Sequence, residues 1–250
     1  MKTNKLIHFT IAACMMAGNL AYAHNHSSGS GITTKSSKAT KAPFDIVQTK
    51  ITTEGNVAVF QMAVSGRAGA SKPVKTGKLA GSTVFSYVWP TTIDPSAIGF
   101  EPKAGILAFA VTSHPDFDDT PLFDENGDGN AKNDGNVWHS HWVVLQPDDA
   151  CGKGALKVVD IPKDTKPKLP KTWPGLPILI DSPGWNPLFS KNTLKIQVPF
   201  DDIGVVNAAT FDGVTAALRV NASVHNPLLC VVNVFKVGSG DLSLPGKPNQ

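Results

Sequence analysis

The sequence predicts an all-β fold, a two-sheet antiparallel sandwich of the immunoglobulin-like or jelly-roll-like kind with two long loops. Short segments that alternate apolar and polar residues recur between turn residues, and no comparably long stretch has helical spacing. The 250 residues include 22 Gly and 19 Pro, which is typical of many short strands joined by turns. Two cysteines, Cys151 and Cys230, are suited to bridging strands of such a fold.

Residues 1–23 have the pattern of a secretory signal peptide. Lys2 and Lys5 precede an apolar run, and a small-x-small sequence ends at Ala23, as in cleaved signals. We expect the mature chain to begin at His24 and to be periplasmic or secreted, an uncleaved anchor being the alternative. No later segment approaches the roughly 18 consecutive apolar residues that a membrane helix requires, so we expect no membrane span after cleavage.

The remaining chain divides by composition into a leader, one domain and a tail. Residues 24–42 are polar and rich in Ser, Thr and Gly, which predicts a flexible leader. We expect a single β-sandwich domain over residues 43–240 and a C-terminal tail over residues 241–250. The formal net charge is +3 without a basic patch interleaved with aromatics, so nucleic acid is not an expected partner.

The strand candidates begin with a hairpin. Residues 45–51 and 57–64 flank a Glu54-Gly-Asn turn, and alternation in the second arm places Ala58, Phe60, Met62 and Val64 on one face. Further candidates are residues 83–89, 105–112, 137–145, 155–161, 193–200, 214–224 and 228–237. In the segment 214–224, alternation predicts that Val214, Ala216, Leu218, Val220, Ala222 and Val224 face the core, whereas Thr215, Arg219, Asn221 and Ser223 face outward.

The opening segment DIVQTKITTEGNVAVFQMAVSGRAG resembles the first hairpin of secreted sandwiches of the carbohydrate-binding-module and DOMON type. The resemblance covers a short part of the chain and implies the fold class alone, because such sandwiches carry sugar, haem and metal sites alike.

Cysteine usage predicts a disulfide. Cys14 leaves with the signal peptide, so Cys151 and Cys230 remain as a pair in an oxidising compartment. Two buried thiols are the alternative.

Two long loops interrupt the strands. The loop at 163–191 contains six prolines together with Trp173 and Trp185, and prolines at that density keep a segment out of a central strand. The loop at 114–136 carries seven acidic residues, which are Asp116, Asp118, Asp119, Asp124, Glu125, Asp128 and Asp134.

The acidic loop contains the first half of an EF-hand-like calcium pattern. Asp124, Asn126 and Asp128 stand at the first, third and fifth positions, followed by a glycine, and Asn130 is placed to offer its carbonyl. Gly135 occupies the place of the final bidentate Glu, so we expect Asp134 or a distant carboxylate to complete the shell. The alternative to this calcium site is a solvated turn rich in Asp, Asn and Gly.

A His-x-His pair follows this loop. His139 and His141 project from the same face of the predicted strand, with Trp138 and Trp142 on the other. Burying tryptophan is favourable and burying unliganded imidazole is costly, so we expect the tryptophans to pack inward and the histidines to line an exposed concavity. His114 and His225 stand at strand–loop junctions. His225, with His114 or a carboxylate such as Asp116, can complete a zinc or copper site, which needs three or four ligands.

The run Trp138-His139-Ser140-His141-Trp142 resembles the zinc strand of α-type carbonic anhydrases, in which two histidines on one face share a catalytic ion with a third histidine from the next strand. The match covers five residues and lacks the downstream Glu-His context of that family. The resemblance therefore implies a shared coordination device, and no activity is carried over from it.

A second copper site is predicted at the mature terminus. Cleavage after Ala23 would leave a free amine followed by His24 and His26, an arrangement that chelates copper(II) in a square plane. A disordered polar tail is the alternative.

These patterns together predict an exported metal-binding β-sandwich protein, with zinc or copper on the His-x-His strand and calcium in the neighbouring loop. One alternative is a zinc-dependent hydrolase or lyase, which needs an open coordination position. The other is a calcium-stabilised module that binds a glycan or another small molecule through its tryptophans.

Overall fold

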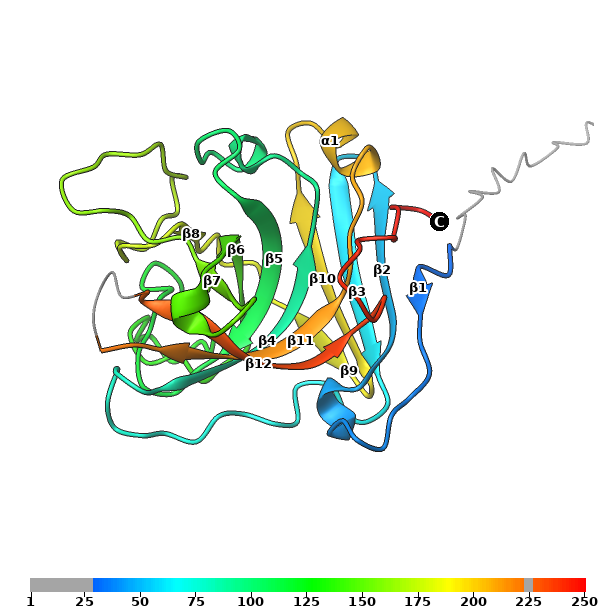
Figure 1. Cartoon of the computed structure of the whole chain (residues 1–250), viewed down its shortest axis with the longest axis horizontal. Coiled ribbons are helices and arrows are strands. Elements are labelled where there is room, and N and C mark those ends of the chain that lie inside the picture. The colour runs from blue at the N-terminus through cyan, green and yellow to red at the C-terminus, as the bar shows by residue number, and fades with distance from the viewer. Residues whose placement is uncertain (1–28, 223–226) are drawn as a thin grey trace, which may run out of the picture.

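The computed structural model describes residues 29–222 and 227–250. Two antiparallel sheets make up the fold, and in Figure 1 the larger sheet lies to the left of the smaller one. The predicted signal peptide and the four residues 223–226 lie outside the described residues.

The smaller sheet has the strand order β1-β2-β3-β10-β9. Its strands are β1 (Ile32–Thr33), β2 (Ile46–Glu54), β3 (Val57–Val64), β9 (Leu188–Ser190) and β10 (Thr193–Pro199). The predicted hairpin is confirmed as β2 and β3, which pair from Ile46 and Val64 to Glu54 and Val57. The four β3 residues that were predicted to share a face, Ala58, Phe60, Met62 and Val64, are all buried.

The larger sheet closes on itself. Its order is β5-β4-β11-β12-β7-β6-β8, and β5 also pairs with β6, so six strands form a barrel with β8 beside β6. Its strands are β4 (Thr83–Pro90), β5 (Ile106–Ser113), β6 (His139–Pro147), β7 (Leu156–Val158), β8 (Ile180–Asp181), β11 (Val214–Val220) and β12 (Leu229–Val237).

This closure corrects the predicted sandwich. Two antiparallel sheets are present as predicted, but one of them is a barrel with an interior of its own. Pairing of β5 with β6 extends from Ile106 and Leu145 to Thr112 and His139. Such a closure gives hydrogen-bond partners to strand edges that an open sandwich leaves unpaired.

The hydrophobic residues form two layers because barrel strands are covered on both faces. One cluster, which includes Phe60, Trp89 and Phe109, packs between the barrel wall and the smaller sheet. The other includes Ala110 and Leu218 and lies inside the barrel. Side chains alternate along a strand, so each barrel strand contributes to both layers.

This double coverage corrects one prediction on β11. Val214, Ala216, Leu218 and Val220 are buried as predicted. Thr215 was expected to face outward, but it is fully buried and its hydroxyl donates a hydrogen bond to the Phe44 carbonyl. Arg219, near the strand end, is exposed as predicted. The outer face of β11 is therefore internal at Thr215 and open to solvent at Arg219.

The elements outside the strands are short. They are the 3-10 turns η1 (Ala42–Phe44), η2 (Pro95–Ala97) and η3 (Asp149–Cys151) and the helix α1 (Gly204–Asn207). None of the helices in the described ranges has the length and hydrophobicity required to span a membrane.

Both ends of the described chain contact the smaller sheet. Within the predicted leader, Ile32 pairs with Thr49, and within the predicted tail the Asn249 amide donates to the Ile51 carbonyl. The Gly31 amide also donates to the Gln250 carbonyl. Hydrogen bonding in this sheet thus extends beyond residues 43–240.

The disulfide between Cys151 and Cys230 is confirmed. It joins η3, which follows β6, to β12, and so ties two parts of the barrel wall that are 79 residues apart in sequence. A cross-link of that span restricts the unfolded chain strongly.

Replacing both cysteines by alanine should lower the free energy of unfolding by about 4 kcal/mol, the chain-entropy estimate for a loop of roughly 80 residues. Urea denaturation of the variant and of the oxidised wild type would measure the difference. Reduction of the wild type should shift its midpoint in the same direction. Equal midpoints for oxidised, reduced and substituted protein would contradict a stabilising role for the bridge.

Candidate metal centre

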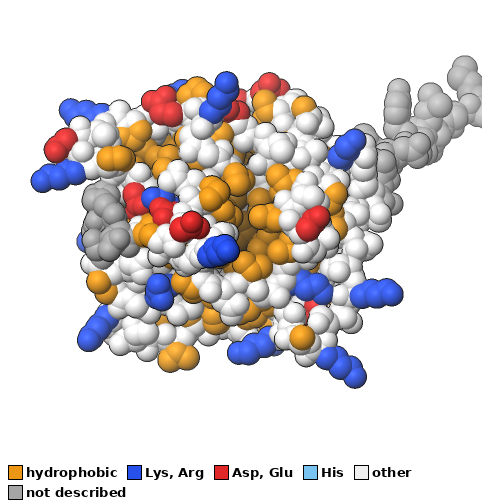
Figure 2. Space-filling model, viewed as in Figure 1, with side chains coloured by type: hydrophobic (Ala, Val, Ile, Leu, Met, Phe, Trp, Pro, Cys, Tyr) orange, Lys and Arg blue, Asp and Glu red, His pale blue; other side chains and the backbone are white. Residues whose placement is uncertain are grey.

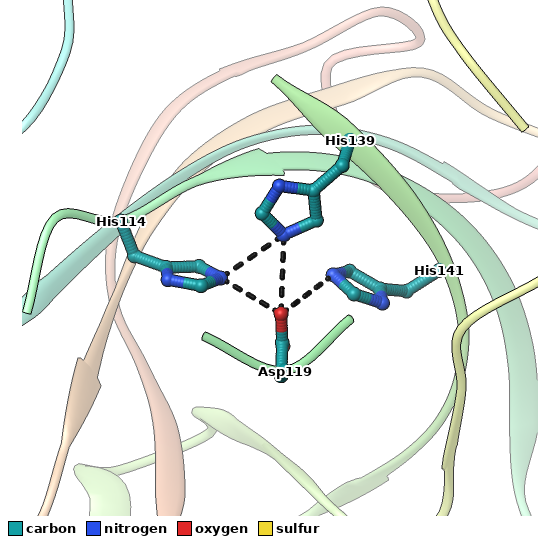
Figure 3. A group of neighbouring side chains, drawn as sticks. All are labelled: His114, Asp119, His139 and His141. Carbon is teal, nitrogen blue, oxygen red and sulfur yellow. Dashed lines mark hydrogen bonds and ion pairs between the residues drawn. The ribbon is translucent and has the colours of Figure 1, made fainter. Parts of the chain in front are cut away.

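Three histidines and one aspartate meet inside the barrel near one end of β5 and β6 (Figure 3). His139 and His141 lie on β6, where the register places them opposite Thr112 and Ala110 of β5. His114 directly follows the last residue of β5. Asp119 comes from the acidic loop and reaches the three imidazoles from the opposite side in Figure 3.

The carboxylate of Asp119 is the centre of the group. Its Oδ1 lies 3.0 Å from Nε2 of His114, 3.1 Å from Nε2 of His139 and 3.3 Å from Nε2 of His141. The Nε2 atoms of His114 and His139 are 3.1 Å apart. One ligand atom from each of the four residues lies within 4.8 Å of all the others, and all four residues are buried.

Hydrogen bonds to Nδ1, on the side of the ring away from Asp119, fix the orientation of the His114 and His139 imidazoles. Nδ1 of His114 lies 2.9 Å from the Phe117 carbonyl, and Nδ1 of His139 lies 2.7 Å from the Val137 carbonyl. A carbonyl oxygen only accepts, so both Nδ1 atoms carry the proton and donate. In the neutral form of each ring, Nε2 then presents a lone pair toward Asp119.

His141 is held in the same orientation through a serine. Its Nδ1 lies 3.0 Å from the Ser182 hydroxyl, and that hydroxyl donates to the Asp119 backbone carbonyl at 2.9 Å. With its proton used in this way, the Ser182 oxygen accepts from Nδ1 of His141. Nε2 of His141 is buried without a hydrogen bond, although it lies 3.3 Å from the Asp119 carboxylate. Ser182 therefore connects two members of the group.

The charges in the group are strongly coupled. Burial by itself raises the pKa of Asp119, yet His141 and His114 hold that pKa well below its ordinary value. Burial lowers the pKa of His141, and Asp119 offsets this in part. Burial also opposes protonation of His139, but its hydrogen bond to Asp119 raises the pKa overall. The carboxylate thus requires a positive counter-charge, which either a proton on His139 or a metal ion can supply.

The structure brings together three of the four histidines predicted for the transition metal. His114, His139 and His141 meet, whereas His225 lies outside the described residues, as do His24 and His26 of the predicted N-terminal copper site. Asp119 was not predicted as a ligand, and the carboxylate suggested as an alternative to His114 was Asp116. Asp116 instead accepts from the backbone amides of Thr76 and Gly77.

The surroundings of the His-x-His strand were predicted correctly on one face only. Trp138 and Trp142 pack inward, 7% and 0% exposed, as expected. The histidines were expected to line an exposed concavity, and this is wrong because His139 and His141 are each 1% exposed. Closure of the barrel covers the face that an open sheet would have left in solvent.

The predicted calcium loop is a turn held by its own side chains. The Asp124 carboxylate accepts from the amides of Gly127, Asp128 and Gly129, and Asp128 accepts from Asn130. Asp134 is fully buried and accepts from the Glu125 amide, whereas Asp124, Asn126, Asp128 and Asn130 are exposed. Within the described ranges, the group around Asp119 is the one set of His, Cys, Asp and Glu side chains arranged for an ion.

Comparison of the chain with protein-family models, with curated proteins and with solved structures gives no match. The resemblances to carbohydrate-binding-module, DOMON and carbonic anhydrase strands therefore stay predictions.

In the metal-free protein, His141 should be neutral with its proton on Nδ1, because the Ser182 oxygen accepts there and burial disfavours the charged ring. Long-range 1H–15N spectra at mildly alkaline pH distinguish the two tautomers. The Ser182→Ala variant removes the acceptor and serves as the control, in which the preference should weaken. A wild-type His141 protonated on Nε2 would show that its lone pair does not face Asp119.

Proposed function

We propose that this protein binds a divalent transition metal ion, zinc or copper, through His114, Asp119, His139 and His141. The observation that carries the proposal is the convergence of three imidazole Nε2 atoms on one buried carboxylate, with each Nδ1 engaged on the outer side. Hydrogen bonds of this kind to the distal nitrogen orient histidine ligands around metals in proteins.

The spacing of the donor atoms suits one ion. Tetrahedral ligands at the usual bond lengths of about 2.0–2.1 Å from zinc are separated by about 3.3 Å. The Asp119 oxygen lies 3.0–3.3 Å from the three Nε2 atoms. These separations are close to those of a coordination shell, and the remaining donor pairs lie within 4.8 Å of each other.

The burial of the group supports the same proposal. Unprotonated Nε2 atoms and a carboxylate oxygen are all acceptors, and packing acceptors together away from water is unfavourable unless a cation lies among them. Imidazole nitrogen with one carboxylate oxygen is a donor set of the type that zinc and copper bind. A metal-bound water that acts as a nucleophile would need one further, open coordination position.

Two finer parts of the proposal rest on sequence patterns. The first is export, which is supported by the signal-like residues 1–23 and accords with the disulfide. The second is a calcium ion in the acidic loop, which is supported by the alternation of Asp124, Asn126 and Asp128. The loop backbone already turns around the Asp124 carboxylate.

Metal-free protein should bind about one equivalent of zinc or copper(II), and the Asp119→Ala and His141→Ala variants should each lose more than about 100-fold in affinity. Loss of an outer partner costs about 10–100-fold, and loss of a ligand should cost more. Titration calorimetry and elemental analysis measure affinity and stoichiometry. Asp116→Ala is the matched control, since it removes an acidic residue of the same loop outside the cluster.

Unchanged affinity in Asp119→Ala and His141→Ala, with both variants folded by circular dichroism, would reject the site. So would the absence of zinc and copper binding in wild-type protein that has been stripped of metal.

Calcium should raise the affinity for zinc or copper, because the loop that carries Asp124 also carries Asp119, and an ion that orders the loop pre-organises the ligand. Linkage requires the two effects to be reciprocal. Zinc titrations with and without calcium, repeated on the Asp124→Ala/Asp128→Ala double variant, measure the coupling. Equal zinc affinities in all cases would show that the loop and the cluster are independent.

A further inference from the structure

A cavity of about 140 Å³ occupies the barrel interior beside the metal-binding group. His114, Asp119 and His141 form part of its wall, and nearly all other lining residues are apolar. Within the described part of the chain, no Lys, Arg or Glu lines it. Among the described lining residues, the polar ends of the candidate ligands are thus the only strongly polar feature that a molecule inside the barrel would meet.

The cavity exists because several inward positions carry small side chains. Ala110 of β5, Ser86 of β4 and Ala216 of β11 line it, at positions where bulky side chains fill the interior of most small barrels. The Ser86 hydroxyl donates to the Ala216 carbonyl and is satisfied within the wall. The middle of the cavity therefore presents hydrocarbon and offers no free hydrogen-bond donor from Ser86.

The cavity also reaches the surface. Two of its lining residues, Leu79 and Val234, are 52% and 49% exposed, so the apolar wall continues from the interior to solvent. Figure 2 shows hydrophobic side chains gathered around a hollow on one face of the molecule, with charged side chains at its margin. The apolar lining of the cavity is therefore continuous with the solvent-exposed surface.

We propose that the barrel interior binds a small, uncharged and mainly apolar molecule of about the size of a benzene ring, placed next to the metal ion. An engineered apolar cavity of about 150 Å³ in another protein binds benzene, and the volume here is similar. Along the described part of the wall, a charged molecule would find no counter-charge apart from the cluster. The placement of the ligand beside an ion rests on the proposed function, whereas its binding in the cavity does not.

Toluene is a suitable probe for the first part, with metal-free protein and binding followed by calorimetry and by 1H–15N spectra. Wild type should bind it, with shifts in amides of β4, β5 and β11. Ala216→Phe fills the cavity and should lower toluene affinity at least about tenfold. Ala110→Leu fills a different part of the wall and provides a second test where the larger substitution disturbs folding.

Ala208→Phe is the matched control because it makes the same chemical change at an exposed position next to α1, and it should bind toluene like wild type. Absence of toluene binding by folded wild-type protein, or equal binding by wild type and both cavity-filling variants, would overturn the inference. Neither result bears on metal binding, which is measured separately.

The second part uses cobalt(II) as a paramagnetic replacement for zinc. If toluene lies beside the ion, its signals should broaden in the cobalt-loaded protein and not in the zinc-loaded protein. Bound cobalt without broadening would overturn the placement. Failure of cobalt, zinc and copper to bind, with toluene still bound by metal-free protein, would overturn the proposed function and the placement but not the apolar binding site.

Discussion

Pairing of β5 with β6 is the interaction on which the rest of the structure depends. It closes the larger sheet into a barrel and aligns Thr112 with His139 and Ala110 with His141. His114 follows β5, and the pairing brings its Nε2 to 3.1 Å from Nε2 of His139 although the two residues are 25 apart in sequence. Without this pairing the His-x-His strand would be an edge, and its two imidazoles would have neither a third histidine nor an enclosed surrounding.

Closure also gives each face of the barrel strands a different role. On β6, Trp138 just before the strand and Trp142 within it pack toward the smaller sheet, and His139 and His141 point into the barrel. The aromatic layer, in which Trp142 contacts Phe60 and Phe109, holds the strand from outside. The positions of the imidazoles are therefore fixed by packing on the face that they do not occupy.

The acidic loop completes the group from the other side, and Asp119 is held there by its hydrogen bonds to His114, His139 and Ser182. Both ring nitrogens of His114 have a partner, since Nδ1 donates to the Phe117 carbonyl and Nε2 faces the Asp119 carboxylate. The orientation of this ring is therefore fixed. Ser182, which directly follows β8, links His141 to the Asp119 backbone. Loop, barrel strand and β8 region thus share one small polar network in an apolar surrounding, where each unpaired group would be costly.

The sequence by itself determined the longer strands, the hairpin of β2 and β3, the disulfide, the inward packing of Trp138 and Trp142, and the shared face of His139 and His141. These follow from alternation with a period of two residues and from cysteine pairing, which are local or compositional properties. The sequence did not predict the short strands β1, β8 and β9, which lie in the predicted leader and in the proline-rich loop. Tertiary structure alone decided that the larger sheet closes, that Thr215 and the histidines are buried, that Asp119 rather than Asp116 meets them, and that small residues on three strands leave a cavity. The physical reason is that the alternation of residues along a strand predicts which side chains share a face. What that face packs against depends on contacts between strands that are distant in the chain.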